Sequence, residues 1–152
     1  MEPVDYFAIQ NLVYTYAAKI DAGDFDAVGA MFEHADVWFP GDKEPTSKKG
    51  KNIMGRMMHE WTRRYPETGN PRTRHVTTNL IIEPDGPNKA RGQCYVVVFQ
   101  QTPAFKLQPV IAGTYIDRFE KVDGKWRFSE RREVMDLIGD LSHHLLQPFG
   151  PG

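Results

Sequence analysis

An aspartate and a histidine are the residues of this chain best suited to acid–base chemistry. Asp21 ends a predicted helix that begins at about Ala8, and His75 lies in a strand-like segment at 73–83. A carboxylate that accepts a hydrogen bond from one imidazole nitrogen fixes the tautomer and leaves the other nitrogen free to take a proton. From the pattern alone, an exposed turn acid and a surface or structural histidine remain open as alternatives.

Other reactive side chains give weaker signals. Tyr16 lies on the apolar face of the first helix, where its phenol could satisfy a buried neighbour or donate to a ligand. Cys94 is the only cysteine and lies in an apolar strand, so we expect it to be packed rather than nucleophilic. His143 and His144 are adjacent, and the sequence contains no cluster with metal-ligand spacing, so we expect no metal site.

Composition and charge narrow the function classes. The chain has 152 residues, 40% of them hydrophobic and 12% aromatic, which predicts one domain with a substantial core. A formal net charge of −1 provides no field that would attract nucleic acid or anionic lipid. The N-terminus lacks a signal-peptide pattern and no segment is apolar over eighteen residues, so the expected location is cytoplasmic, with no membrane partner.

The first half of the chain has helical periodicity. Apolar side chains of the first segment recur every three or four residues, at Ile9, Leu12, Val13, Tyr16, Ala17 and Ile20. Gly23 is expected to end this helix, and Asp24 to cap a short second helix over 25–32. After a short strand at 36–39, a Met-rich stripe predicts a third helix over about 52–65.

The second half has the period of two that is typical of strands. Segments 73–83, 90–101, 110–120 and 125–135 are separated by turn residues, which predicts an antiparallel, strongly curved sheet. Helices followed by strands indicate the α+β class. In the first of these strands, His75, Thr77, Asn79 and Ile81 are expected to share one face. The tail 136–152 is expected to add a loose helical turn around Leu137, Ile138 and Leu141, ended by Pro148 and Pro151.

Motifs that carry a family resemblance are spread over residues 5 to 135. They are Ile9-Gln10-Asn11-Leu12 with Tyr14, Ile20-Asp21 with Asp24, Trp38, Arg74-His75 with Thr78-Asn79, and Asp123-Gly124-Lys125-Trp126-Arg127-Phe128. At these positions the chain resembles the SnoaL-like branch of the nuclear transport factor 2-like superfamily.

The resemblance implies a cone-shaped α+β fold, in which a curved mixed sheet wraps around three N-terminal helices and leaves a central pocket. Family members include scytalone dehydratase, bile-acid dehydratase, hexachlorocyclohexane dehydrochlorinase, polyketide cyclases and steroid isomerase relatives. Several of them carry out lyase chemistry without a metal or organic cofactor. Small subunits of aromatic-ring dioxygenases share the scaffold and are catalytically silent, so the fold alone does not establish catalysis.

The resemblance also suggests roles for individual residues. The dehydrochlorinase and the bile-acid dehydratase carry an Asp at the end of the first helix and a His on the strand, which match Asp21 and His75. A Tyr in the bile-acid enzyme matches Tyr16, although the dehydrochlorinase has Lys there. An Arg on the last strand of the dehydrochlorinase matches Arg131.

These observations predict a cofactor-independent lyase of the dehydratase type, acting on a small hydrophobic molecule that is polyketide, steroid-like or aromatic. His75 would be the base and Asp21 its partner, while Tyr16 and Arg131 would donate hydrogen bonds to the leaving group or to an enolate oxygen. The expected apolar wall of the substrate pocket is formed by Trp38, Met54, Met58, Phe99 and Tyr115.

Two alternatives remain open. A polyketide cyclase or isomerase would use the same pocket without losing water, and a non-catalytic ligand-binding or partner subunit would use the fold alone.

We expect a single domain over 1–152, with its core at about 5–135. Because family members associate through the exposed sheet face, a homodimer or homotrimer is the expected assembly.

Overall fold

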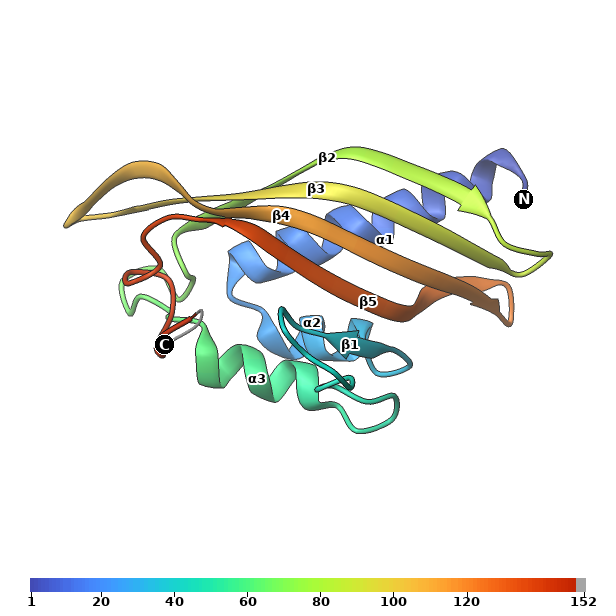
Figure 1. The fold of residues 1–152 in the computed structure, drawn as a ribbon, viewed down its shortest axis with the longest axis horizontal. Helices are drawn as coiled ribbons and strands as arrows, with labels where there is room; N and C mark the ends of the chain where they lie inside the picture. Colours follow the sequence, from blue (N-terminus) through green and yellow to red (C-terminus); the bar gives the residue numbers. More distant parts are fainter. Residues whose placement is uncertain (150–152) are drawn as a thin grey trace.

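Three helices precede a five-stranded sheet in this protein. The structure, a computed structural model, describes residues 1–149. Along the chain, the elements are α1 (Pro3–Ala22), α2 (Phe25–Met31), β1 (Asp36–Trp38), α3 (Ile53–Trp61), β2 (Thr73–Pro84), β3 (Lys89–Thr102), β4 (Phe105–Val122) and β5 (Lys125–Ile138). Figure 1 shows α1 lying along one face of the arched sheet, with α2 and α3 at the bottom of the view.

The sheet is mixed, curved and open. Its strand order is β1-β5-β4-β3-β2, so β1 and β2 form the two edges. The long strands β2 to β5 pair antiparallel with their neighbours, whereas β1 pairs parallel with β5. The predicted α+β class, with a curved mixed sheet and N-terminal helices, is confirmed.

Local residue chemistry explains where α1 begins and ends. The helix starts five residues earlier than predicted, at Pro3, because Glu2 and Asp5 form a reciprocal capping box. It ends as predicted at Gly23, which adopts a left-handed conformation with φ of 78°. A Cβ at this position would lie 2.3 Å from the carbonyl oxygen of Gly69, so any larger residue would displace that loop from the end of α1.

The second and third helices pack closely together. Asp24 caps α2 as predicted, because its carboxylate accepts a hydrogen bond from the Ala27 N–H. A Cβ on Gly29 of α2 would lie 2.8 Å from the Gly55 Cα of α3, so small residues are required at this crossing. The third helix ends at Trp61, earlier than predicted, because Thr62 is extended and forms a bridge with Leu145.

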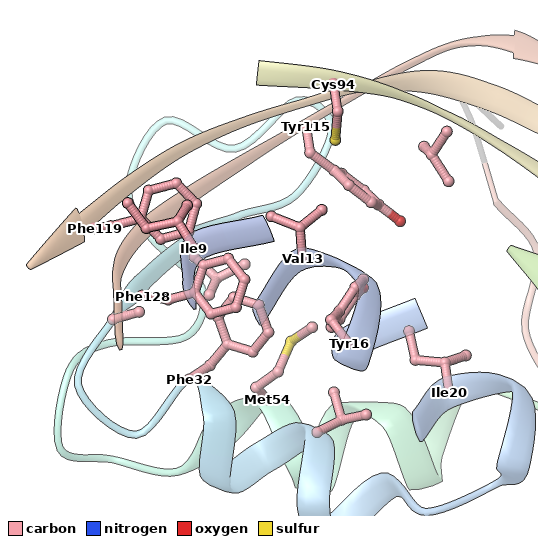
Figure 2. Packing of buried hydrophobic residues seen from close by; sticks show 14 of the residues in the cluster. Ile9, Val13, Tyr16, Ile20, Phe32, Met54, Cys94, Tyr115, Phe119 and Phe128 are labelled. Atoms are coloured by element: carbon pink, nitrogen blue, oxygen red, sulfur yellow. The ribbon is translucent and has the colours of Figure 1, made fainter. Parts of the chain in front are cut away.

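The hydrophobic core lies between α1 and the sheet. Figure 2 shows side chains of α1 directed toward aromatic rings of β4 and β5. Its largest fully buried apolar side chains include Phe25, Phe32, Phe119, Phe128, Ile9 and Met54. Burial of each such side chain contributes on the order of 1.5–3 kcal/mol to the free energy of folding. This packing fixes the positions of the helices and strands that carry the polar groups described below.

A bulge in β2 corrects the predicted faces of this strand. Asn79 has a left-handed φ of 54°, and the pairing with β3 shifts between Thr78 and Ile81. Ile81 is consequently 52% exposed, whereas Leu80 packs against the core. The prediction that Asn79 and Ile81 continue the face of His75 was therefore wrong, because the extra residue inverts the alternation.

The tail differs from the predicted helical turn. Leu137 and Ile138 belong to β5 and are exposed, so they do not form a helical apolar side. A single turn follows, in which the N–H groups of His144 and Leu145 donate to the Leu141 carbonyl. Extension of the strand pairing with β4 overrides the weak helical pattern, and Pro151 lies outside the described residues.

Within residues 1–149, none of the helices combines the length and the apolar character needed to cross a membrane.

Asp5 connects the start of α1 to the hairpin between β4 and β5. Its carboxylate accepts hydrogen bonds of 2.8 Å from both Trp126 Nε1 and Lys121 Nζ, and one of 2.9 Å from the Glu2 N–H. The hydrogen bonds from Lys121 and Trp126 hold the pKa of Asp5 well below its usual range. The Trp126 position of the family motif therefore has a structural role here.

We expect Asp5→Asn to lower the melting temperature by several degrees, because it removes the charge that Lys121 and Trp126 bind. The contribution of a carboxylate with a lowered pKa is present above its ordinary value of 3.8 and is lost as pH falls. Thermal unfolding at pH 7 and at acidic pH measures both effects. Equal melting temperatures at pH 7 would contradict this prediction, and Asp136→Asn, at an exposed site, is the control.

Candidate active site

Asp21 and His75 meet where the end of α1 contacts the start of β2. His75 Nδ1 lies 2.6 Å from Asp21 Oδ1, and the His75 backbone N–H donates to Asp21 Oδ2 over 2.8 Å. The Thr73 hydroxyl donates a third hydrogen bond to the same carboxylate, also over 2.8 Å. The structure therefore brings together the two residues of the predicted dyad at hydrogen-bonding distance.

The loop before β2 places Thr73 and His75 beside the helix end. The Tyr65 N–H donates to the Asn70 carbonyl, which closes a turn against Gly23. Asn70 Oδ1 then accepts from the Arg72 N–H over 2.9 Å, and Arg72 adopts a left-handed φ of 57°. This sharp bend starts β2 directly opposite Asp21.

The electrostatics of the pair favour an ionised Asp21 and one histidine tautomer. Burial opposes ionisation of Asp21, but the hydrogen bonds and charge of His75, with help from Thr73, lower its pKa below the usual value. A carboxylate can only accept, so His75 Nδ1 must carry a hydrogen. In the neutral ring, Nε2 then has the free lone pair required of a general base.

The dyad borders a groove between α1 and β2. Both side chains are nearly buried, with 6% of His75 and 9% of Asp21 exposed. The groove has a volume of about 440 Å³. Its lining comprises Tyr14, Ala17, Ala18, Asp21, Ala22, Arg74, His75 and Thr77. Small apolar side chains and a few polar groups therefore surround a space large enough for a ring-sized molecule.

The expected wall residues do not line this groove. Met54 and Tyr115 are buried in the core, and Met58 packs against it. Trp38 lies beneath the Arg132 guanidinium, whose carbon is 3.9 Å from the ring centroid. Phe99 alternates with the buried positions of β3 and so faces away from the core. Their role in substrate binding stays a prediction.

Arg131 and Tyr16 belong to a second polar cluster, inside the core. Arg131 is fully buried and makes two hydrogen bonds to Asp117, of 2.7 and 2.8 Å. Its guanidinium carbon lies 4.2 Å from the ring centroid of Tyr16 and 4.0 Å from that of Tyr115. The cation is thus neutralised by a bidentate carboxylate and held between two aromatic faces. Burial raises the pKa of Tyr16 well above its usual range, so its phenol stays protonated.

Glu133 is an ionisable neighbour of the Arg131 cluster that the sequence interpretation missed. It is the cross-strand partner of Tyr115 and lies two residues after Arg131, on the same face of β5. Glu133 is partly exposed. Burial raises the pKa of its carboxyl to about 7, although the charge of Arg131 opposes this rise. The signal was its spacing of two from Arg131, because alternate strand residues share a face.

The described residues contain other histidine arrangements. His59 Nε2 lies 2.9 Å from Asp26 Oδ1, but Asp26 is 92% exposed, so water competes for this pair. The tail places His144 beside His75, with ring centroids 6.3 Å apart, a contact that the sequence interpretation did not foresee. No group of three or more His, Cys, Asp or Glu side chains in residues 1–149 has an arrangement that could hold a metal ion.

The sequence and fold can now be compared with known families. A model of the SnoaL-like domain matches residues 4–132. The chain belongs to the SnoaL-like domain family. This finding confirms the resemblance inferred from the motifs. A comparison with curated protein sequences finds no match.

Solved structures of similar fold differ in their assigned roles. Rv3472 of Mycobacterium tuberculosis, a protein of unknown function, is 26% identical with a TM-score of 0.67, covering 89% of this chain and 78% of that chain. Hexachlorocyclohexane dehydrochlorinase LinA-type3 of Novosphingobium barchaimii is 21% identical with a TM-score of 0.66. The match covers 98% of this chain and 96% of the dehydrochlorinase chain. The beta subunit of a candidate aromatic-ring-hydroxylating dioxygenase of Novosphingobium aromaticivorans is 18% identical with a TM-score of 0.67. The match covers 89% of this chain and 91% of the beta subunit.

We expect Arg131→Ala to lower the free energy of unfolding by about 3–5 kcal/mol, because it leaves the Asp117 carboxylate buried without a cation. Urea denaturation measures the loss. The double variant Arg131→Met with Asp117→Leu should recover most of it, since it removes both charges. Comparable instability of the single and double variants would contradict the prediction, and a stable but inactive double variant would support the predicted catalytic role of Arg131.

Glu133 should make stability pH-dependent. A carboxyl with a raised pKa favours the folded state when protonated, so its contribution is present below 4.5 and is lost as pH rises to about 7. Glu133→Gln mimics the protonated form and should reduce the loss of stability between pH 5 and pH 8, measured by urea denaturation. Identical pH profiles for Glu133→Gln and the wild type would contradict this assignment, and the exposed Glu67→Gln is the control.

Proposed function

We propose that this protein is a cofactor-independent lyase of the dehydratase type that acts on a small hydrophobic molecule. The observation that carries the proposal is the buried Asp21–His75 pair beside a groove. Its support lies in the tautomer that Asp21 imposes on His75, which leaves a ring nitrogen ready to accept a proton. The dehydrochlorinase with a similar fold supports elimination chemistry only through the shared scaffold.

The proposed reaction is a β-elimination. His75 Nε2 takes a proton from carbon, the electron pair of that C–H bond forms the new double bond, and the bond from the adjacent carbon to the leaving oxygen breaks. Asp21 stabilises the imidazolium that forms on His75. The leaving hydroxyl takes a proton from a general acid, for which Glu133 is the candidate, and departs as water.

The core cluster contains groups that would bind the leaving oxygen if substrate reached them. Tyr16 lies five residues before Asp21 on α1, about 7.5 Å along the helix axis and about 140° around it, and is buried in the core, so it would contact substrate only if core side chains rearrange. Its protonated phenol would donate a hydrogen bond, as would Nη1 of Arg131, which has no partner among residues 1–149. Glu133, with a pKa of about 7, is the group best able to transfer a proton near neutral pH.

The substrate is expected to be a polyketide, a steroid-like compound or an aromatic compound. The alanines that line the groove favour a substrate with an apolar body. The base requires that this substrate place an acidic C–H group next to His75. The residues expected to line the wall, Trp38, Met54, Met58, Phe99 and Tyr115, would contact substrate only if side chains of the core rearrange. A cyclase or isomerase would use the same base but would not release water.

One observation favours a non-catalytic role. The centre of the fold is filled by Arg131 and its aromatic neighbours, and a packed interior suits a subunit that stabilises a partner. The outer sheet face also exposes Val76, Tyr95, Ile116 and Val134. These side chains support association through the sheet, as a homodimer, as a homotrimer or with another chain.

The proposed function predicts measurable chemistry on a simple probe. We expect the protein to convert 3-hydroxycyclohexanone to cyclohexenone and water, followed by ultraviolet absorbance, and to exchange the acidic C–H protons of the probe in D2O. His75→Ala should slow turnover by about 10²–10⁴-fold, the usual size of general-base assistance. Asp21→Asn should cause a comparable loss through the tautomer.

Controls separate the alternatives. His34→Ala removes a partly exposed histidine and should leave the rate unchanged. Proton exchange without formation of cyclohexenone would favour the isomerase or cyclase reaction. Wild-type rates for His75→Ala would reject the mechanism, and inactivation by a chelator that added metal reverses would contradict cofactor independence. Absence of both exchange and elimination would favour the non-catalytic role.

A further inference from the structure

The segment 141–146 is held over the dyad by hydrogen bonds to distant parts of the chain. The His143 carbonyl accepts from Tyr65 Oη over 2.6 Å and from Gln100 Nε2 over 2.9 Å. The His144 carbonyl accepts from the Arg63 N–H over 2.8 Å. These bonds orient the His144 ring toward β2, where it meets the His75 ring edge-on at an interplanar angle of 64°.

Two buried polar atoms beside the dyad have no partner. His144 is 7% exposed and Gln100 is 1% exposed. Within residues 1–149, neither His144 Nδ1 nor Gln100 Oε1 makes a hydrogen bond. The Gln100 amide orientation is set, because its Nε2 donates to the carbonyls of both Pro71 and His143. Buried polar atoms are normally paired, so two orphans around one site require an explanation.

The connections of these residues place them at the same end of the sheet as the dyad. Gln100 is the cross-strand partner of Thr73, whose hydroxyl binds Asp21. It also binds the residue immediately before His144. The His144 ring in turn contacts His75. The two residues with unpaired atoms are thus linked to the dyad, Gln100 through Thr73 and His144 through its ring contact with His75.

We propose that His144 Nδ1 and Gln100 Oε1 form a polar subsite that binds a hydroxyl group of the substrate next to His75. Gln100 Oε1 can only accept, so the ligand group must donate. A hydroxyl can donate to Gln100 and bind His144 at the same time, whereas a carbonyl oxygen can only accept. His144 and Gln100 would therefore be specificity-determining residues for an alcohol.

Burial supports this role for His144. It lowers the pKa of His144 to about 3, and the charge of His75 acts in the same direction. The ring is therefore neutral near neutral pH and does not compete with His75 for a proton. A neutral imidazole held by backbone contacts can position an oxygen without taking part in proton transfer.

The inference rests on the proposed function of the Asp21–His75 site, but its test measures binding. The probes are cyclohexanol, cyclohexanone and methylenecyclohexane, which share a six-membered ring and differ in hydrogen-bonding capacity. NMR of ¹⁵N-histidine-labelled protein follows the His144 and His75 resonances during each titration. We expect cyclohexanol to bind saturably and to shift the His144 Nδ1 resonance, with weaker binding of cyclohexanone and the weakest binding of methylenecyclohexane.

Variants separate hydrogen bonding from packing. His144→Phe keeps an aromatic ring against His75 but removes Nδ1, and should weaken cyclohexanol binding about tenfold, the loss expected for one hydrogen bond. His144→Asn restores a polar atom and should bind within about threefold of the wild type on the same scale. His143→Phe is the matched control, because the His143 ring stacks on Phe105, whereas it is the His144 ring that contacts His75.

Several outcomes would overturn the inference. These are equal binding of cyclohexanol and methylenecyclohexane, an unchanged His144 resonance, wild-type binding by a folded His144→Phe variant, or no binding of cyclohexanol at millimolar concentration. An ordered water that the alcohol does not displace would leave the His144 resonance unchanged or prevent cyclohexanol from binding. A normal rate for His75→Ala would instead reject the proposed reaction and leave the binding result intact.

Discussion

The buried ion pair between Arg131 and Asp117 is the interaction around which the rest of the structure is arranged. Removing two charges from water is costly, and only accurate hydrogen-bond geometry with close packing can offset the cost. The bidentate pair joins β5 to β4, and the ring of Tyr16 brings α1 against the same guanidinium. Helix and strands are therefore held in one register. The centre of the fold is then closed by side chains, and this leaves the junction of α1 and β2 as the place where a buried dyad can border a groove.

Placing Asp21 at this junction has an electrostatic cost that explains the start of β2. A carboxylate in the last turn of a helix faces the negative end of the helix dipole. Three donors from Thr73 and His75 compensate for it, so the dyad also anchors an edge strand. The two carboxyl groups of the candidate site have opposite environments as a result. The pKa of Asp21 is lowered by His75, which keeps Asp21 ionised as the partner of the proposed base, whereas burial raises the pKa of Glu133, which suits a proposed acid.

Local signals in the sequence were sufficient for much of the fold. Gly23 and Asp24 marked the turn between the first helices, and period-two patterns located the four long strands. The face of β2 beyond Thr78 could not be predicted, because a bulge depends on strand pairing and not on local composition. For the site, family motifs indicated Asp21 and His75. Glu133 could have been found from its spacing to Arg131, but its raised pKa depends on burial beneath other elements. His144 is joined to His75 only through contacts between segments about seventy residues apart, for which the sequence carries no periodic signal.

The tail contacts also bear on how the dyad could function. His75 and Asp21 are nearly buried, and the segment 141–146 contributes to this shielding through His144. Exclusion of water strengthens the hydrogen bond between the two side chains and reduces competition for the free imidazole nitrogen. The same shielding leaves His144 Nδ1 and Gln100 Oε1 without a hydrogen-bond partner among the protein groups of residues 1–149. A site that is shielded but incompletely paired gains most from a ligand that supplies the missing hydrogen bonds, so the constraint that would protect the proposed base would also favour a hydroxyl-bearing molecule over an apolar one of equal shape.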